Sequence, residues 1–294
     1  MKKVKIEAYF KKRREIVERA LSRCLPGDRS SVSRAMRYSV LSGGKRIRPI
    51  LCLASCDAVG GGWRKALGPA CSIELVHTYS LIHDDLPCMD DDDFRRGKPT
   101  CHRKFGEAVA VLAGDALLAH AFSLISGSRS LSDEIARKAA AELSKASGPS
   151  YLIAGQAADL AAEEKPLKSV KELEGIHMRK TAALIAASVK IGALCGGASK
   201  EDLRAIERYG WSVGLAFQVV DDLLDATGSK KKLGKAVRKD AALGKATYPA
   251  LLGIEKSKQI AFSLRERAIN ALKGFDRKAD PLRLIAEYLT TRTS

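Results

Sequence analysis

Apolar residues recur at helical spacing in nearly every segment of this 294-residue chain, whereas the alternating pattern of β-strands is scarce. The composition agrees, because 46% of the residues are hydrophobic and only 5% are aromatic, which leaves aliphatic side chains to fill the core. No Pro-, Gly- or Ser-rich linker and no internal repeat divides the chain. We therefore predict one all-α domain, a helical bundle that spans residues 1–294.

Proline and glycine mark several of the predicted helix ends. Pro26 ends the first helix, Gly43 and Gly44 end the second, and Pro49 opens a third that stops at the glycines of positions 60–62. The first two helices are predicted at residues 6–23 and 30–42. Apolar periodicity predicts further helices at residues 67–85, 105–126, 130–147, 151–162, 173–194, 200–227 and 243–272.

Two clusters of aspartate stand out because the other runs of charge are mostly basic. Like-charged carboxylates held close together either raise their pKa values or recruit a metal ion. Oxygen ligands without histidine or cysteine favour Mg²⁺, which completes its coordination with water and substrate phosphates. Apolar stretches at residues 73–82 and 211–220 precede the clusters, which favours an interior position over a solvated acidic surface. The candidate metal ligands are Asp84, Asp85, Asp90, Asp221, Asp222 and Asp225.

The spacing within the two clusters differs. Asp221 and Asp225 are four residues apart and share one helix face. Asp84 and Asp90 are six residues apart and would lie on different faces of a regular helix, but Pro87 disrupts the turn before it. We expect the chain to loop there and to return Asp90 toward Asp84.

Short basic segments supply the cations that a phosphorylated substrate needs. One of them follows two glycines at a helix start, where backbone amides can approach an anion. Another follows the first acidic cluster and contains two arginines, whose guanidinium groups can bind phosphate with two hydrogen bonds each. A surface loop and a local salt-bridge network are the respective alternatives. The candidates for substrate contact are Gly44, Lys45, Arg48, His77, Arg95 and Arg96, whereas His83 is expected to be structural.

Other classes of protein fit the composition less well. The net charge of +17 would suit nucleic acid, but the chain has no recognisable nucleic-acid-binding module and few aromatic residues to stack on bases. Seven cysteines without a CxxC pair, and no evident targeting segment, favour reduced thiols in the cytoplasm. Asp115 and Lys190 interrupt the longest apolar stretches, so no membrane span is expected.

With these segments in view, the chain resembles a trans-polyprenyl diphosphate synthase of the bacterial short-chain type. The matching motifs occur in the family's order over nearly the whole chain, at residues 45–49, 83–90, 95–100, 155–159, 180–181, 217–222 and 244–249. The resemblance implies an isoprenoid synthase fold, in which helices surround a deep apolar cavity and the two acidic clusters face each other at its mouth. It also implies a homodimer.

The resemblance gives individual residues a role. Three Mg²⁺ ions, or Mn²⁺ in their place, would bridge an allylic diphosphate to the protein; Asp84 and Asp90 match the ligands of two ions and Asp221 those of the third, supported by Asp85, Asp222 and Asp225. In the family, one group of residues holds the allylic diphosphate, and the matching residues here are Arg95, Lys180 and Lys235. Another group holds isopentenyl diphosphate, and the matching residues here are Lys45, Arg48, His77 and Arg96. Oxygen atoms of Thr181 and Gln218 would stabilise the allylic carbocation.

The implied reaction is prenyl transfer in isoprenoid biosynthesis. Metal ions and cationic side chains stabilise the departing diphosphate, and the carbocation forms in a cavity closed to water. The double bond of isopentenyl diphosphate attacks this carbocation, and the released diphosphate takes the final proton. No protein nucleophile is required.

Product length is expected to depend on the residues four and five positions before Asp84. These are Ser80 and Tyr79, which lie about one turn deeper in the helix, where a growing tail would pass. The resemblance implies that a bulky side chain at the fifth position forms the cavity floor. Tyr79 therefore predicts farnesyl diphosphate, with fifteen carbons, and a geranylgeranyl or geranyl diphosphate synthase is the alternative.

Two further classes remain as alternatives. A terpene cyclase shares the cavity and the first cluster, but it usually carries an Asn/Ser/Glu pattern at the second metal site and needs no isopentenyl diphosphate pocket. A non-catalytic partner subunit tends to lose one acidic cluster, whereas both are complete in this sequence.

Overall fold

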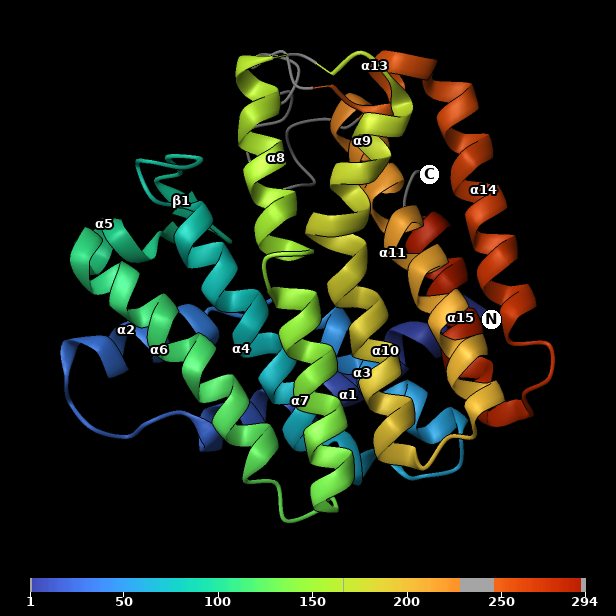
Figure 1. Cartoon of the computed structure of the whole chain (residues 1–294), viewed down its shortest axis with the longest axis horizontal. Coiled ribbons are helices and arrows are strands. Elements are labelled where there is room, and N and C mark those ends of the chain that lie inside the picture. Colours follow the sequence, from blue (N-terminus) through green and yellow to red (C-terminus); the bar gives the residue numbers. More distant parts are fainter. Residues whose placement is uncertain (1, 166, 228–245, 292–294) are drawn as a thin grey trace.

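The computed structural model describes residues 2–165, 167–227 and 246–291, and its regular structure is almost entirely helical, as predicted (Figure 1). The α-helices are α1 (Lys2–Cys24), α2 (Ser31–Val40), α3 (Ile47–Ala58), α4 (Leu67–Asp84), α5 (Cys101–Phe105), α6 (Glu107–Ser126), α7 (Asp133–Ser147), α8 (Leu152–Glu164), α9 (Val170–His177), α10 (Ala183–Gly196), α11 (Lys200–Thr227), α13 (Tyr248–Leu252), α14 (Ile254–Ala271) and α15 (Asp280–Thr290). Short 3₁₀ turns occur at Trp63–Ala66 (η1) and Arg277–Ala279 (η3), and a π-helical segment, η2, spans Met178–Ala182.

Several helices begin where a serine side chain can cap them. Ser30, Ser132 and Ser169 each accept a hydrogen bond from the backbone amide three residues later, which satisfies one of the unpaired amides of a first helical turn. The start of α3 differs from the prediction, because Ile47 opens the helix and Pro49 is its third residue. Proline is tolerated there because the first-turn amides have no partner within the helix.

Other predicted elements need correction. Glycines with positive φ, Gly106 and Gly253, divide the predicted helices 105–126 and 243–272. Residues 173–194 form α9, η2 and α10 instead of one helix, and α15 was not predicted. A small antiparallel hairpin, β1 (Phe94–Arg95) with β2 (Lys98–Pro99), was not predicted either.

The core surrounds α4, α10 and α11. Helix α4 packs against α6 and α3, α10 packs against α3 and α11, and α11 packs against α14. Small residues line much of α10, which is buried along almost its whole length. The C-terminal ends of α4 and α11 both point to the upper part of the view in Figure 1, so the fold carries both acidic clusters to the same end of the bundle.

Helix α6 qualifies the expectation that no segment could cross a membrane. This helix is long and apolar enough to span a bilayer, even though it contains Asp115. Within the fold, 33% of the apolar stretch is buried. Helices that pack into the core of a soluble protein pass the same test. The packing of α6 against α4 and α2 makes it part of the bundle.

Candidate active site

The first acidic cluster lies at the end of α4 and in the loop that follows. Asp84 is the last residue of α4, and its carbonyl accepts a hydrogen bond of 2.8 Å from the amide of Asp90. The carbonyl of Asp85 accepts one of 3.3 Å from the amide of Asp92. The loop therefore closes on the helix end, which confirms that the chain turns near Pro87 and returns Asp90 toward Asp84.

The electrostatics of this cluster favour a cation. Burial raises the pKa of Asp84 to about 6, the ammonium of Lys180 opposes this rise, and the carboxylate of Asp90 adds to it. A divalent ion would stabilise the charged carboxylates, so the site fits Mg²⁺. Within the described residues, no three acidic, histidine or cysteine side chains form a metal site by themselves. A bound ion would therefore complete its coordination with water and ligand phosphate.

Asp85 is held by an arginine. Nε of Arg95 donates to both carboxylate oxygens of Asp85, at 2.7 and 2.9 Å, and Asp85 is buried. Arg95 also lies 3.7 Å from a carboxylate oxygen of Asp92. The sequence predicts that Asp85 supports a metal ion and that Arg95 binds the allylic diphosphate. In this structure the two neutralise each other, because a buried charge requires a hydrogen-bonded partner.

Lys180 and Thr181 lie in the π-helical segment η2, between α9 and α10. Such segments are rare and often occur at functional sites. The ammonium of Lys180 donates to Oδ2 of Asp159 on α8 at 2.6 Å, and the hydroxyl of Thr181 donates to Oε1 of Gln218 on α11 at 3.0 Å. The segment η2 therefore contacts both α8 and α11. Lys180 also opposes the rise in the pKa of Asp84, so η2 places a cation near the first acidic cluster.

The second acidic cluster ends α11. Asp221 is exposed, and Asp225 lies half-buried one turn later. Asp222 is buried, and its carboxylate accepts hydrogen bonds from protein groups, so its supporting role toward a metal ion stays a prediction. The donors are the amide of Tyr248 (3.0 Å) and the side-chain amide of Gln218 (3.3 Å), and Nε2 of His177 lies at 3.4 Å. Asp222 therefore anchors the start of α13 to α11. The predicted Lys235 lies outside the described residues.

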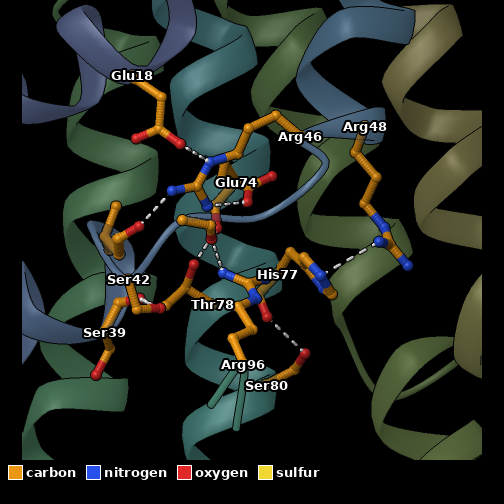
Figure 2. A network of polar contacts seen from close by, with 12 residues as sticks. Glu18, Ser39, Ser42, Arg46, Arg48, Glu74, His77, Thr78, Ser80 and Arg96 are labelled. Carbon is orange, nitrogen blue, oxygen red and sulfur yellow. Dashed lines mark hydrogen bonds and ion pairs between the residues drawn. The ribbon is translucent and has the colours of Figure 1, made fainter. Parts of the chain in front are cut away.

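Arg48, His77 and Arg96 form a basic cluster at the start of α3, on α4 and in the hairpin (Figure 2). Nη1 of Arg48 lies 3.3 Å from Nε2 of His77, and Nη1 of Arg96 donates to the carbonyl of Gly43. Burial first, and then the nearby arginines, lower the pKa of His77 well below its ordinary value, so the neutral ring can accept a hydrogen bond from Arg48. The guanidinium of Arg96 also lies against Gly44, where an added Cβ would be 2.9 Å from Cζ.

Within the described residues, this basic cluster has no directly bound carboxylate. Burial lowers the pKa of Arg48 to about 10, and Nε of Arg48 is buried without a hydrogen-bond partner. In the parts of the chain that the structure describes, neither Arg48 nor Arg96 forms a salt bridge with a carboxylate. Half-buried guanidinium groups without a salt-bridge partner fit an anionic ligand. Lys45, the other predicted cation, is exposed beside this group.

The residues predicted to set product length lie deeper along α4. Tyr79 is buried, its hydroxyl lies 3.5 Å from the carbonyl of Ser147 on α7, and its ring meets the ring of His83 edge-on. The hydroxyl of Ser80 donates to the carbonyl of His77 at 3.0 Å. His83 has a structural contact, as expected, because its Nε2 lies 3.1 Å from the carbonyl of Val111 on α6.

Several residues that contact the predicted site residues were not predicted from the sequence. Asp159 binds Lys180 and belongs to the 155–159 motif, so its position carried a signal that was not used. His177 and Arg46 were not predicted either. His177 lies next to the predicted Asp222 in space, and Arg46 follows the predicted Lys45 in the sequence. Nothing in the local pattern indicates that Glu18, on α1, contacts Arg46.

Known proteins resemble this chain along most of its length. Residues 29–279 match the family described as polyprenyl synthetase. A chloroplastic geranylgeranyl pyrophosphate synthase of Capsicum annuum is 50% identical over 263 residues, which cover 89% of this chain and 71% of that protein. A heterodimeric geranylgeranyl pyrophosphate synthase large subunit 1 of Arabidopsis thaliana is 47% identical over 97% of this chain and 79% of its own length.

Solved structures share the fold. An FPP/GFPP synthase from Zymomonas mobilis superposes with a TM-score of 0.89 at 37% identity, over 99% of this chain and all (100%) of that chain. The isoprenoid synthase fold expected from the motifs is therefore confirmed. Since the family match covers residues 29–279 and both sequence and fold agree with these synthases over most of the chain, this protein belongs to the polyprenyl synthetase family.

Proposed function

We propose that this prenyltransferase condenses isopentenyl diphosphate with an allylic diphosphate and that its main product is geranylgeranyl diphosphate. One observation carries the reaction: the carboxylate of Asp84, with its raised pKa, lies in the same region around the end of α4 as the guanidinium groups of Arg48 and Arg96, which form no salt bridge within the described residues. A metal-binding group beside an anion-binding group suits two diphosphates, one ionised with metal assistance and one held by cations.

The residues of the two clusters then have separate tasks. Asp84, Asp90 and Asp221 hold Mg²⁺, which supplies charge neutralisation for the departing diphosphate. Lys180 adds a cation to the same diphosphate, while the oxygen atoms of Thr181 and Gln218 stabilise the allylic carbocation. Lys45, Arg48, His77 and Arg96 bind isopentenyl diphosphate, with His77 as a neutral hydrogen-bonding group.

The product assignment has two candidates. Curated plant relatives named as geranylgeranyl pyrophosphate synthases are 46–50% identical to this chain, which supports the twenty-carbon product over the predicted farnesyl diphosphate. Tyr79 favours farnesyl diphosphate as the second candidate, because it is a bulky buried residue about one turn before the first cluster, where a growing tail is expected to pass.

A product assay tests both levels of this proposal. Purified protein is incubated with Mg²⁺, labelled isopentenyl diphosphate and either dimethylallyl, geranyl or farnesyl diphosphate, and the products are sized by chromatography. We expect a twenty-carbon product from every primer. A fifteen-carbon end product would favour the second candidate, and no incorporation of label would overturn the function. Asp84→Asn should be inactive, whereas Asp93→Asn, at an exposed position beside the cluster, should remain active.

We also propose that the protein is a homodimer in which α6 contributes to the interface. Val111 and Leu112 on this helix are 40% and 53% exposed, and α6 is the most apolar long helix that the structure describes. Large apolar side chains that stay exposed on a helix are typical of an interface between subunits.

A further inference from the structure

The side chain of Arg46 is buried in a polar network next to the basic cluster (Figure 2). Nε donates to Glu18 at 2.7 Å, Nη1 donates to Glu74 at 2.5 Å, and Nη2 donates to the carbonyl of Val40 at 2.5 Å. Its side chain is 0% exposed, and its backbone adopts a left-handed conformation with φ of 51°. Non-glycine residues seldom adopt this conformation, so the network must compensate for its cost.

Glu74 lies close to the arginines that we assign to isopentenyl diphosphate. It is on α4, three residues before His77, which contacts Arg48. It is buried. Burial lowers the pKa of both Arg48 and Arg96, and the negative charge of Glu74 opposes this fall, so Glu74 lies close enough to act on both arginines. A carboxylate in such a position requires a cationic partner, because an unpaired buried charge is costly.

We propose that Arg46 is a positioning residue that binds the Glu74 carboxylate and thereby leaves Arg48 and Arg96 available to the diphosphate of isopentenyl diphosphate. Without Arg46, Glu74 would form its ion pair with Arg48 or Arg96, and the substrate would have to compete with an internal carboxylate. This inference rests on the proposed function of the basic cluster. It adds that Arg46, the first arginine of the loop, controls affinity for one substrate without contacting it.

The test compares substitutions at Arg46 and at its two carboxylate partners. For each variant, steady-state kinetics give KM for isopentenyl diphosphate and, separately, KM for geranyl diphosphate. Calorimetry without an allylic primer gives Kd for isopentenyl diphosphate alone. For Arg46→Met we expect KM and Kd for isopentenyl diphosphate to rise by about tenfold or more, with KM for geranyl diphosphate changed by less than about threefold.

Removal of the competing carboxylate should reverse this effect. Arg46→Met/Glu74→Gln should recover most of the affinity for isopentenyl diphosphate, although the network stays broken. The matched control is Arg46→Met/Glu18→Gln, which should not recover it, because the side chain of Glu18 is 30% exposed and its charge is partly hydrated. Arg46→Lys, which keeps the positive charge, should lose less affinity than Arg46→Met.

Three outcomes would overturn the inference: parallel rises of KM for both substrates, no recovery in the Glu74→Gln double variant, or equal recovery in the Glu18→Gln double variant. If Arg46→Met does not fold, Glu74→Gln alone decides the question. Its affinity for isopentenyl diphosphate should equal or exceed that of the wild type, and a weaker affinity would contradict the proposal. A wild-type protein that incorporates no isopentenyl diphosphate would instead overturn the proposed function itself.

Discussion

Neighbouring aspartates in each acidic cluster differ in what surrounds them. Asp85 is bound by Arg95, and Asp222 accepts hydrogen bonds from Tyr248 and Gln218, so both are engaged by protein groups within the fold. Asp84 has a pKa raised by burial and by other carboxylates, a state that a divalent cation relieves. Asp84 is therefore the aspartate whose surroundings most clearly favour a cation, while the supporting roles of Asp85 and Asp222 toward a metal ion stay predictions.

The raised pKa of Asp84 predicts how stability varies with pH. Because this pKa is about 6 in the folded protein and 3.8 for an ordinary aspartate, the folded state binds more protons than the unfolded state between these values. The free energy of unfolding of the metal-free protein should therefore fall as pH rises from about 4 to about 6, by on the order of 2 kcal/mol from this residue. Asp84→Asn should remove this contribution and be more stable than wild type at pH 7.

Urea unfolding in the presence of a chelator, at pH 4.5 and 7.5, measures this effect. Asp93→Asn is the control, because Asp93 is exposed and its substitution should leave the pH dependence unchanged. An Asp84→Asn protein with the same pH dependence as wild type would contradict the prediction. Addition of Mg²⁺ and diphosphate should stabilise the wild type, because the ligand binds the folded state, and should stabilise Asp84→Asn less.

Tyr79 provides the second prediction for a single residue. Its buried ring lies between the end of α4 and Ser147 on α7, so truncation would open space along the path of a growing tail. We expect Tyr79→Ala to lengthen the product by at least one five-carbon unit, as measured by chromatographic sizing. Tyr79→Phe keeps the bulk and should leave the length unchanged. Identical products from the alanine variant and the wild type would show that Tyr79 is an ordinary core residue.

At the level of elements, the sequence pattern identified the long helices but not their irregular parts. Periodicity cannot distinguish one helix from α9, η2 and α10, because a π-helical turn adds a residue without breaking the apolar pattern. The hairpin has strands of only two residues, which is too short for an alternating pattern. Motifs located Lys180 and Asp222, but their partners Asp159 and Tyr248 are distant in sequence, so the pattern could not supply these contacts.

The contact between α8 and η2 gives a prediction at this scale. Gly155 permits it, because an added Cβ would lie 2.3 Å from the amide nitrogen of Lys180. Gly155→Ala should force α8 away from η2, lower the free energy of unfolding by about 1–3 kcal/mol and lower kcat, since Lys180 and Thr181 would move. The control is Gly175→Ala on α9, where the nearest atom to an added Cβ would be Nη2 at the flexible tip of Arg179, at 3.6 Å. Thermal melts and kinetics that do not distinguish the two variants would contradict this account.

For the whole molecule, the surplus of basic charge is not explained by the site. The net charge of +17 exceeds what the basic cluster contributes. The cytoplasmic location and the deep apolar cavity stay predictions. The apolar face of α6 is the large-scale feature with a direct consequence, because α6 also contacts the end of α4, where the carbonyl of Val111 lies 3.1 Å from Nε2 of His83.

This contact links assembly to the site and gives the last prediction. A charge at Leu112 would be buried in a dimer interface formed by α6, so Leu112→Glu should weaken the dimer by at least about tenfold in Kd. Light scattering coupled to size-exclusion chromatography measures the mass, and activity should fall with dimer content because α6 loses its support beside the first cluster. Phe262→Glu is the control, since Phe262 on α14 is 56% exposed and lies outside the proposed interface. A monomeric wild type, or a Leu112→Glu protein that dimerises like the control, would assign this apolar face to another role.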